Sequence, residues 1–202
     1  MMSELTYRRM RDQVVDLLRE EILSGRLTEG NPLREIPLAE RFQTSRGPIR
    51  DAILQLTQEG LLVSQPNRGA KVAPVWDEQL RPIMVDIRFE LESYAVWKIL
   101  ELDPPHDLVV FRRNLKLFQL ACKNKDFPSV VQLDMGFHRL LLRESRVPAL
   151  EPVWLPVMGG MRLPYSRHAK LIESYYEHET IVEALAERNG EAAVAALKQN
   201  IR

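Results

Sequence analysis

The chain has few of the features that mark secreted or membrane proteins. Its single cysteine, Cys122, cannot form an intrachain disulfide and fits a reducing compartment. The least polar stretch, residues 152–161, is too short to span a bilayer, and residues 1–9 lack the apolar core of a signal peptide. The 28 Lys and Arg residues are matched by 28 Asp and Glu residues, so no net charge attracts a polyanion or a lipid surface. These absences predict a cytoplasmic protein without a membrane partner.

Recognisable catalytic motifs are absent as well. The sequence contains no HExxH metal-hydrolase motif, no GxSxG nucleophile elbow and no glycine-rich phosphate loop. It does contain 202 residues, 45% of them apolar, which suits one large domain or two small ones with a real core. Residues 1–76 hold 11 Lys and Arg against 10 Asp and Glu, and the remainder holds 17 against 18. Any contact with nucleic acid therefore has to come from a local patch.

Residues 44–62 carry the most informative local pattern. Four apolar residues recur at the spacing of the buried face of a helix, namely Ile49, Ala52, Ile53 and Leu56. Ser45 is placed to cap this helix and Gly60 to end it. Arg46 and Arg50 lie four apart on one face near its start, which suits a helix that enters the major groove of DNA. An ordinary surface helix with two solvated arginines is the alternative.

Two further helical patterns precede this helix. Apolar residues at helical spacing extend over residues 7–24, and a second short helix is predicted over residues 33–42. Only Gln43, Thr44 and Ser45 separate the second helix from the arginine-bearing one. Two short helices joined by a tight polar turn, the second with arginines at its start, form a helix-turn-helix.

A β-hairpin is predicted directly after the helix-turn-helix. Residues 61–64 and 70–73 are short extended runs, with a cluster of turn-forming residues between them. Beside a helix-turn-helix, such a hairpin is a wing whose tip can lie on the DNA backbone or in the minor groove. Arg68 and Gly69 occupy the tip and Lys71 follows, and glycine there permits a close approach to DNA.

On these patterns, residues 7–74 resemble the winged-helix domain of GntR-type bacterial transcription regulators, and the predicted domain spans residues 1–74. The resemblance is carried by residues 22–25 with Leu27, 38–40, 45–46 with 48–52, 59–61, and 68–70 with Val72. It implies that the start of the arginine-bearing helix contacts bases and a phosphate of operator DNA, while the hairpin tip enters the minor groove. The implied DNA-binding set is Thr44, Ser45, Arg46, Arg50, Arg68, Gly69 and Lys71.

From residue 77 onward the sequence predicts only helices, so the fold class is mainly α, with an all-α bundle over residues 77–202. Asp77 can cap the first helix. Pro148 and Pro152 bound a short segment that Pro156 interrupts. The five longer helices are predicted over residues 77–102, 106–124, 126–145, 171–188 and 191–201. The inward stripe of the first is predicted to comprise Leu80, Met84, Ile87, Leu91, Tyr94 and Ile99.

Asp134 and His138 form a candidate polar site inside this bundle. The two residues lie four apart, so both side chains project from one helix face, and apolar neighbours suggest that this face points inward. Such a pair is either a satisfied hydrogen bond of the core or two ligands of a divalent metal. His178, on a later helix, offers another imidazole. His106, in a proline-rich turn, is expected at the surface.

Three runs of this half resemble FCD, the effector domain of the FadR branch of GntR regulators. They are residues 88–92 (Arg-Phe-Glu-Leu-Glu), 134–138 (Asp-Met-Gly-Phe-His) and 177–178 (Glu-His). Many FCD domains hold a divalent metal such as zinc, nickel or manganese with one Asp and three His. The implied ligand set here is Asp134, His138, His178 and, in place of the fourth histidine, Asn200. An asparagine carbonyl ligates zinc or nickel more weakly than imidazole does, and His168 is a candidate substitute.

The same resemblance implies a small organic acid as effector, bound in a cavity beside the metal. Arginine is the natural partner of a carboxylate. Arg88 on the first helix of the bundle is the leading candidate, followed by Arg139 and Arg162. For each of them a solvated or salt-bridged surface arginine is the alternative.

The leading interpretation is a ligand-responsive transcription regulator, expected to repress. A homodimer would place two winged helices on a pseudo-palindromic operator, with half-sites about one helical turn apart. Two alternatives stay open. A metal-dependent hydrolase or isomerase would use Asp134, His138 and His178, although no general base is evident beside them. A helical interaction module would use its winged helix to bind protein instead of DNA.

Overall fold

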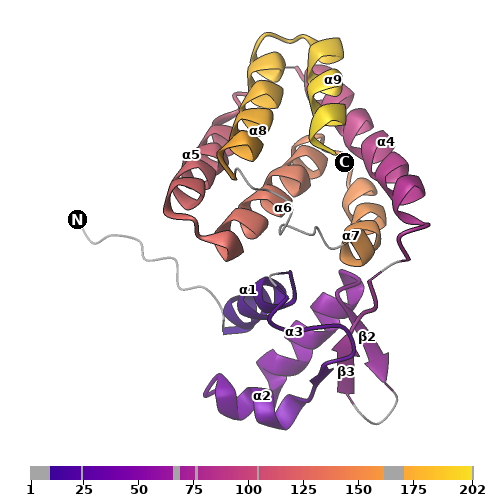
Figure 1. Cartoon of the computed structure of the whole chain (residues 1–202), viewed down its shortest axis with the longest axis vertical. Helices are drawn as coiled ribbons and strands as arrows, with labels where there is room; N and C mark the ends of the chain where they lie inside the picture. Colours follow the sequence, from indigo (N-terminus) through magenta and orange to yellow (C-terminus); the bar gives the residue numbers. More distant parts are fainter. Residues whose placement is uncertain are drawn as a thin grey trace. The chain divides into compact units, whose positions relative to one another are not determined.

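The structure is a computed structural model that describes residues 10–23, 25–65, 69–75, 77–103, 105–161 and 171–201. The chain divides into two compact units, Met1–Pro74 and Val75–Arg202, which Figure 1 draws with their helices and strands labelled. Among the described helices, none combines the length and the apolar character needed to cross a membrane.

The first unit contains three helices and a small antiparallel sheet. Its helices are α1 (Met10–Leu23), α2 (Glu35–Arg41) and α3 (Arg46–Gln58). Its strands are β1 (Pro32–Leu33), β2 (Leu62–Gln65) and β3 (Gly69–Val72), in the order β1-β3-β2. Strands β2 and β3 are the two arms of the predicted hairpin, so the predicted fold class of winged helix-turn-helix is confirmed.

The core of this unit explains why α3 forms where the sequence predicts it. Ile49, Ala52 and Leu56 are fully buried on α3, at the helical spacing noted above. They pack with buried aliphatic residues of α1, namely Val14, Leu18 and Ile22. Ser45 lies at the predicted N-cap with extended backbone angles, but its side chain makes no capping hydrogen bond. Burial of the apolar stripe, not the cap, therefore stabilises α3.

The start of α2 differs from the prediction. The predicted helix begins at residue 33, whereas Leu33 lies in β1 and pairs with Ala70 of β3. A strand of two residues leaves no alternating pattern in the sequence, so only its tertiary partner defines it. Gly69 is required by this pairing, because it has a φ of +85° and a Cβ there would lie 2.8 Å from the carbonyl oxygen of Leu33.

Helices are the regular secondary structure that the second unit forms in its described residues. Its helices are α4 (Arg81–Leu100), α5 (Val109–Asn124), α6 (Phe127–Glu144), α7 (Leu150–Met161), α8 (Leu171–Ala186) and α9 (Gly190–Asn200). Helix α6 packs against α4, α5 and α7, while α8 packs against α5 and α9 (Figure 1). Asp126 and Asn189 cap α6 and α9 with their side chains. The predicted all-α bundle is confirmed.

Two of the predicted helix boundaries in this unit are wrong. Helix α7 runs through Pro156 to Met161, although the sequence predicts an interruption at that proline. Pro156 and Pro152 both lie on the exposed side of α7, while Trp154, Val157 and Met158 are buried on the other side. Burial of that face offsets the hydrogen bond that the proline cannot make. Asp77 accepts a hydrogen bond from the backbone of Gln79 in the turn before α4, so it does not cap the helix.

Helix α4 turns a different face inward from the one predicted. Leu80, Ile87 and Tyr94 of the predicted inner stripe are exposed. Of the predicted stripe only Ile99 is buried, and the other buried residues of α4 are Arg88, Glu92, Ser93, Ala95 and Val96. The apolar pattern predicts the wrong face because two charged side chains, Arg88 and Glu92, are buried on the inner face. Hydrogen-bond partners elsewhere in the bundle offset the cost of burying them.

His106 is not the free surface residue that the sequence predicts. Its Nε2 lies 2.7 Å from Oε2 of Glu144, and its Nδ1 accepts a hydrogen bond from the backbone N–H of Leu108. Because only 10% of its side chain is exposed, the ring serves as a link between the start of α5 and the end of α6.

Candidate DNA-contacting surface and metal site

The turn between α2 and α3 holds the arginines in solvent. Gln43 takes a left-handed conformation, with a φ of 50°, between the end of α2 at Arg41 and the start of α3 at Arg46. Arg50 is exposed on α3, and the side chain of Arg46 is 64% exposed. Nε and Nη2 of Arg46 donate to Oε2 of Glu35 on α2, at 3.0 and 2.6 Å. An exposed pair of this kind contributes little to stability, so the guanidinium remains exchangeable.

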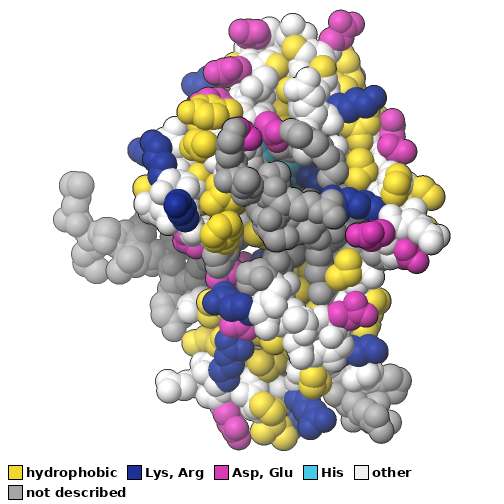
Figure 2. Space-filling model, viewed as in Figure 1, with side chains coloured by type: hydrophobic (Ala, Val, Ile, Leu, Met, Phe, Trp, Pro, Cys, Tyr) yellow, Lys and Arg dark blue, Asp and Glu magenta, His cyan; other side chains and the backbone are white. Residues whose placement is uncertain are grey.

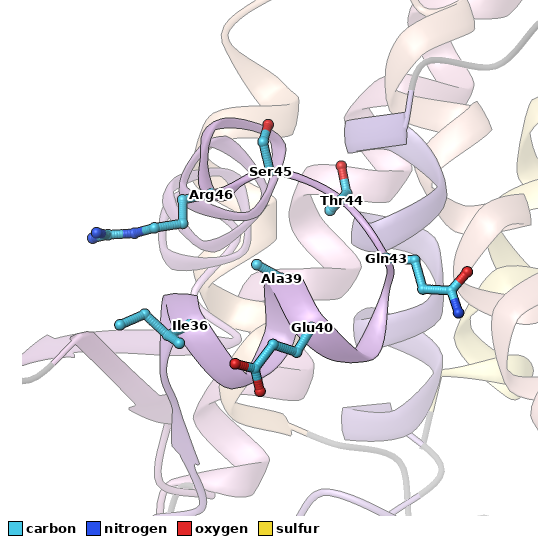
Figure 3. A pocket seen from close by; sticks show the side chains of 7 residues that line it. All are labelled: Ile36, Ala39, Glu40, Gln43, Thr44, Ser45 and Arg46. Carbon is cyan, nitrogen blue, oxygen red and sulfur yellow. The ribbon is translucent and has the colours of Figure 1, made fainter.

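A shallow pocket of about 340 Å³ lies where α2 meets the start of α3. Figure 3 shows its lining, which consists of Ile36, Ala39, Glu40, Gln43, Thr44, Ser45 and Arg46. In this view the side chains of Thr44 and Ser45 point to the same side, while that of Arg46 extends away from α3. The predicted DNA-binding residues Thr44, Ser45 and Arg46 are thus neighbours on one surface.

The wing is described except for its tip. Arg68 lies outside the described residues. Gly69 begins β3, and Lys71 follows between the buried residues Ala70 and Val72. Because successive side chains of a strand point to opposite faces, Lys71 faces away from the core.

Asp134 and His138 of α6 meet His178 of α8 in the interior of the helical unit. All three side chains are buried, and one ligand atom from each lies within 4.8 Å of the others. Oδ1 of Asp134 is 3.7 Å from Nε2 of His138, and Oδ2 is 3.5 Å from Nε2 of His178. The predicted pair on α6 and the later imidazole are therefore brought together.

Hydrogen bonds at the opposite nitrogens orient both rings. Nδ1 of His138 lies 2.6 Å from Oε2 of Glu92, and Nδ1 of His178 lies 2.7 Å from the carbonyl oxygen of Ser174. A carboxylate and a carbonyl can only accept, so Nδ1 carries hydrogen in both rings. Among the described residues, neither Nε2 has a hydrogen-bond partner. Two imidazole lone pairs beside a carboxylate fit a divalent ion such as zinc, nickel or manganese.

The charges around these rings favour the forms that bind metal. Burial lowers the pKa of His178 to about 4, an effect that the nearby carboxylate of Asp134 opposes, so the ring is neutral at pH 7. Burial alone would raise the pKa of the Glu92 carboxyl, but the charge of Arg88 and the hydrogen bonds from His138 and Arg88 lower it to about 2. Phe118 and Phe137 pack edge-on against His178, with centroids 4.9 and 4.7 Å away.

The predicted fourth ligand lies against the other edge of His178. The Asn200 amide nitrogen is 3.4 Å from Nδ1 of His178 and donates to Oε2 of Glu177 at 3.2 Å. Nδ1 is the nitrogen opposite the one that faces Asp134. His168, the candidate substitute, lies outside the described residues.

Two of the three predicted effector-binding arginines lie among the described residues, and their settings differ. Arg88 is buried, and its Nε donates to Oε1 of Glu92 at 2.8 Å. Glu92 in turn contacts Nδ1 of His138, so the guanidinium lies near the candidate metal ligands. Arg139 pairs with Glu151 at the start of α7. Arg162 lies outside the described residues.

Two residues of this site were not predicted from the sequence. Glu92 contacts His138, and Trp154 of α7 donates its indole N–H to Oε1 of Glu92 at 2.7 Å. The spacing of Arg88 and Glu92, four apart on one helix, signalled an ion pair but not its burial. Nothing in the sequence signalled Trp154, because its partner lies 62 residues away.

Both units match known protein families. Residues 10–72 match the model of bacterial regulatory proteins of the gntR family, and residues 84–202 match the FCD domain. The chain is 25% identical over 197 residues to the HTH-type transcriptional repressor RspR of Escherichia coli K12, with 94% of this chain and 85% of the relative covered. It is 25% identical over 193 residues to the gluconate operon transcriptional repressor of Bacillus subtilis, with 91% and 78% covered. The solved structure of E. coli McbR/YncC superposes with a TM-score of 0.76 at 26% identity, with 96% and 93% covered.

Proposed function

The chain belongs to the gntR family of bacterial regulatory proteins and carries an FCD domain, and we propose how this DNA-binding transcription regulator uses its two units. Helix α3 contacts operator DNA, and the helical unit binds a small carboxylate beside a divalent metal. The observation that carries the first half is the exposure of Arg46 and Arg50 at the start of α3. Two free imidazole nitrogens facing Asp134 carry the second half. Action on bacterial DNA places the protein in the cytoplasm.

The DNA contact would begin with exchange of an ion pair. Arg46 leaves Glu35 and, with Arg50, reaches base edges in the major groove, where arginine pairs bidentately with guanine. Thr44 and Ser45 lie at the start of α3, where hydroxyls and backbone N–H groups suit phosphate. Arg68, Gly69 and Lys71 of the wing would contact the adjoining backbone or minor groove. The set is the one that the sequence predicts.

This assignment is tested by measuring operator binding of single variants in gel shifts. We expect Arg50→Ala and Arg46→Ala each to weaken specific binding about 10- to 100-fold, because each removes a base contact. Arg26→Ala is the matched control, since Arg26 is an exposed arginine of the same unit that pairs with Glu20. Operator affinity that is unchanged in both recognition variants would contradict the assignment.

In the helical unit, Asp134, His138 and His178 would hold a zinc, nickel or manganese ion. Asn200, the fourth ligand that the sequence predicts, would have to turn its carbonyl away from the Nδ1 edge of His178 to reach that ion. Such an ion would supply positive charge for a carboxylate at its open positions. Arg88 would be the second anchor, because Glu92 engages its Nε and the two terminal nitrogens form the fork that pairs with a carboxylate. Arg139 is the weaker candidate because Glu151 already holds it. Arg162 remains a candidate from the sequence.

Homodimerisation would use the outer face of α4. Its exposed apolar side chains are Leu80, Ile83, Ile87, Tyr94 and Trp97, which follow one another at intervals of three, four, seven and three residues. Figure 2 shows hydrophobic side chains along the edge of the helical unit on the side of α4. A continuous stripe of this kind suits a second copy of the same helix, as in a two-fold interface. Two copies would present two α3 helices to an inverted repeat.

The effector would act by preferring one arrangement of this dimer. A ligand shifts an equilibrium only through its different affinities for the DNA-competent and incompetent states. Elemental analysis of the purified protein, with mass spectrometry of co-purified acids, tests the metal and the ligand together. Protein that contains no stoichiometric metal, and takes up none from added Zn²⁺, would contradict the metal half of the proposal.

A further inference from the structure

We propose that Glu92 is the positioning residue that prepares His138 to bind metal, an inference that rests on the metal site proposed above. Glu92 lies on α4, which carries none of the three candidate ligands. Its Oε2 is 2.6 Å from Nδ1 of His138, and both side chains are fully buried. The role of Glu92 is to decide which ring nitrogen carries hydrogen.

The orientation of the carboxylate is determined by two other donors. Its Oε1 accepts one hydrogen bond from Nε of Arg88 at 2.8 Å and one from the indole N–H of Trp154 at 2.7 Å. Both donors are buried, and they come from α4 and α7. Oε2 is left for His138. Three donors therefore converge on a group that can only accept, and none of the three can be exchanged for water at this depth.

The consequence for His138 is a fixed tautomer. With Nδ1 donating to Glu92, the lone pair of the neutral ring lies on Nε2, which faces Asp134. A histidine that ligates a metal through one nitrogen is commonly held in this way by a carboxylate on the other, which orients the ring and raises its basicity. The helix bearing the FCD signature at residues 88–92 thus contributes to the metal site without supplying a ligand.

A change of Glu92 to glutamine separates this role from simple packing. The amide has one acceptor oxygen and one donor nitrogen, so it cannot accept from all three donors. If its oxygen keeps Arg88 and Trp154, its NH₂ faces Nδ1 of His138, and the ring must move its hydrogen to Nε2. If the amide is reversed, its NH₂ faces the two other donors instead. The reversed amide keeps the tautomer of His138 but sets its NH₂ against two donors, so the first arrangement, which removes the metal-binding tautomer, is favoured.

The test measures Zn²⁺ affinity by competition with a chromophoric chelator, using the full chain. We expect Glu92→Gln to bind Zn²⁺ about 10- to 100-fold more weakly than wild type. Glu90→Gln is the matched control, because Glu90 is exposed on the same helix, and wild-type affinity is expected for it. Nitrogen NMR of labelled histidine in metal-free protein is the second readout, since the chain has only 4 histidines. The hydrogen of His138 is expected on Nδ1 in wild type and no longer on Nδ1 alone in Glu92→Gln.

A second variant keeps the inference testable if Glu92→Gln does not fold. Trp154→Phe removes only the indole donor and preserves an aromatic ring, so we expect a smaller loss of Zn²⁺ affinity in the same direction. If Glu92→Gln folds and binds Zn²⁺ with wild-type affinity, the proposed role of Glu92 is wrong. If Glu92→Gln does not fold, wild-type Zn²⁺ affinity in Trp154→Phe would overturn that role instead. Asp134→Ala separates a failure of the proposed metal site from a failure of the role given to Glu92. If wild type binds no Zn²⁺, or if Asp134→Ala binds it unchanged, the metal site itself is wrong and the inference falls with it.

Discussion

His138 and His178 differ from most buried histidines in that each leaves one ring nitrogen without a hydrogen bond among the described residues. A buried polar atom without a partner normally costs free energy, so such atoms concentrate at sites that bind something. The hydrogen bonds at Nδ1 determine which nitrogen is left free. In the first unit, Arg46 is held by Glu35 yet largely exposed. At both sites, therefore, single side chains are oriented by one partner while other polar atoms stay available to a ligand: Nε2 of each histidine, and the exposed guanidinium of Arg46.

Gly69 allows a prediction at the same scale. Gly69→Ala is expected to lower the free energy of unfolding by more than Gly30→Ala, which is the matched control. Both glycines have a φ near +80°, where an alanine is strained by about 1–2 kcal/mol. Only at Gly69 would the new Cβ also meet a backbone atom, the carbonyl oxygen of Leu33, at 2.8 Å, whereas nothing lies within 4 Å at Gly30. Urea unfolding measures the free energy of unfolding of both variants. Equal losses would show that β1 moves away from the new Cβ at no cost in free energy, which would contradict the prediction.

Helix α4 is the element on which the helical unit depends, and its two faces have unusual chemistry. The inner face carries the buried pair of Arg88 and Glu92, while large apolar side chains lie outside. Burying a charged pair in place of apolar residues seldom stabilises a fold by itself, so such a pair points to specificity or function. The outer face carries an exposed apolar stripe, which is unfavourable in water unless another surface covers it. Each face of α4 thus points to a function.

Ile87 tests the outer face. We expect Ile87→Glu to convert a dimer into monomers, because a carboxylate in a two-fold interface would be buried close to its own copy. Leu120→Glu, on the exposed side of α5, is the matched control and is expected to leave the dimer intact. Sedimentation velocity at micromolar concentration measures the outcome. A wild-type protein that is monomeric, or an Ile87→Glu variant that remains dimeric, would contradict the proposed interface.

The whole molecule has no net charge, which limits how it can bind DNA. A protein that coats nucleic acid does so through a general positive field, whereas this one has only the local cations of α3 and the wing. Its operator affinity should therefore depend on a small number of phosphate contacts. Under the function proposed above, the unit that matches the gntR model contacts bases and the unit that matches the FCD model binds a ligand.

Lys71 provides the prediction at this scale. If Lys71 contacts a phosphate, Lys71→Ala should reduce the slope of log affinity against log salt by about 1 and weaken binding to all sequences alike. Lys116→Ala, an exposed lysine on α5, serves as the control and should leave the slope unchanged. Fluorescence anisotropy of labelled operator over a range of salt concentrations gives both slopes. An unchanged slope for Lys71→Ala would remove this residue from the predicted DNA-binding set.

The sequence by itself determined the winged helix-turn-helix, the helical second half and the family, because periodic apolar residues, caps and short motifs are local signals. The spacing of Asp134 and His138 likewise placed them on one inward face. Only the tertiary structure decided which face of α4 is buried, that β1 exists, and that α7 continues through Pro156. It alone brought Glu92 to His138 and Trp154 to Glu92, since those two contacts join residues 46 and 62 positions apart along the chain. Such partners leave no periodic trace, because the free energy that selects them arises only when the helices pack together.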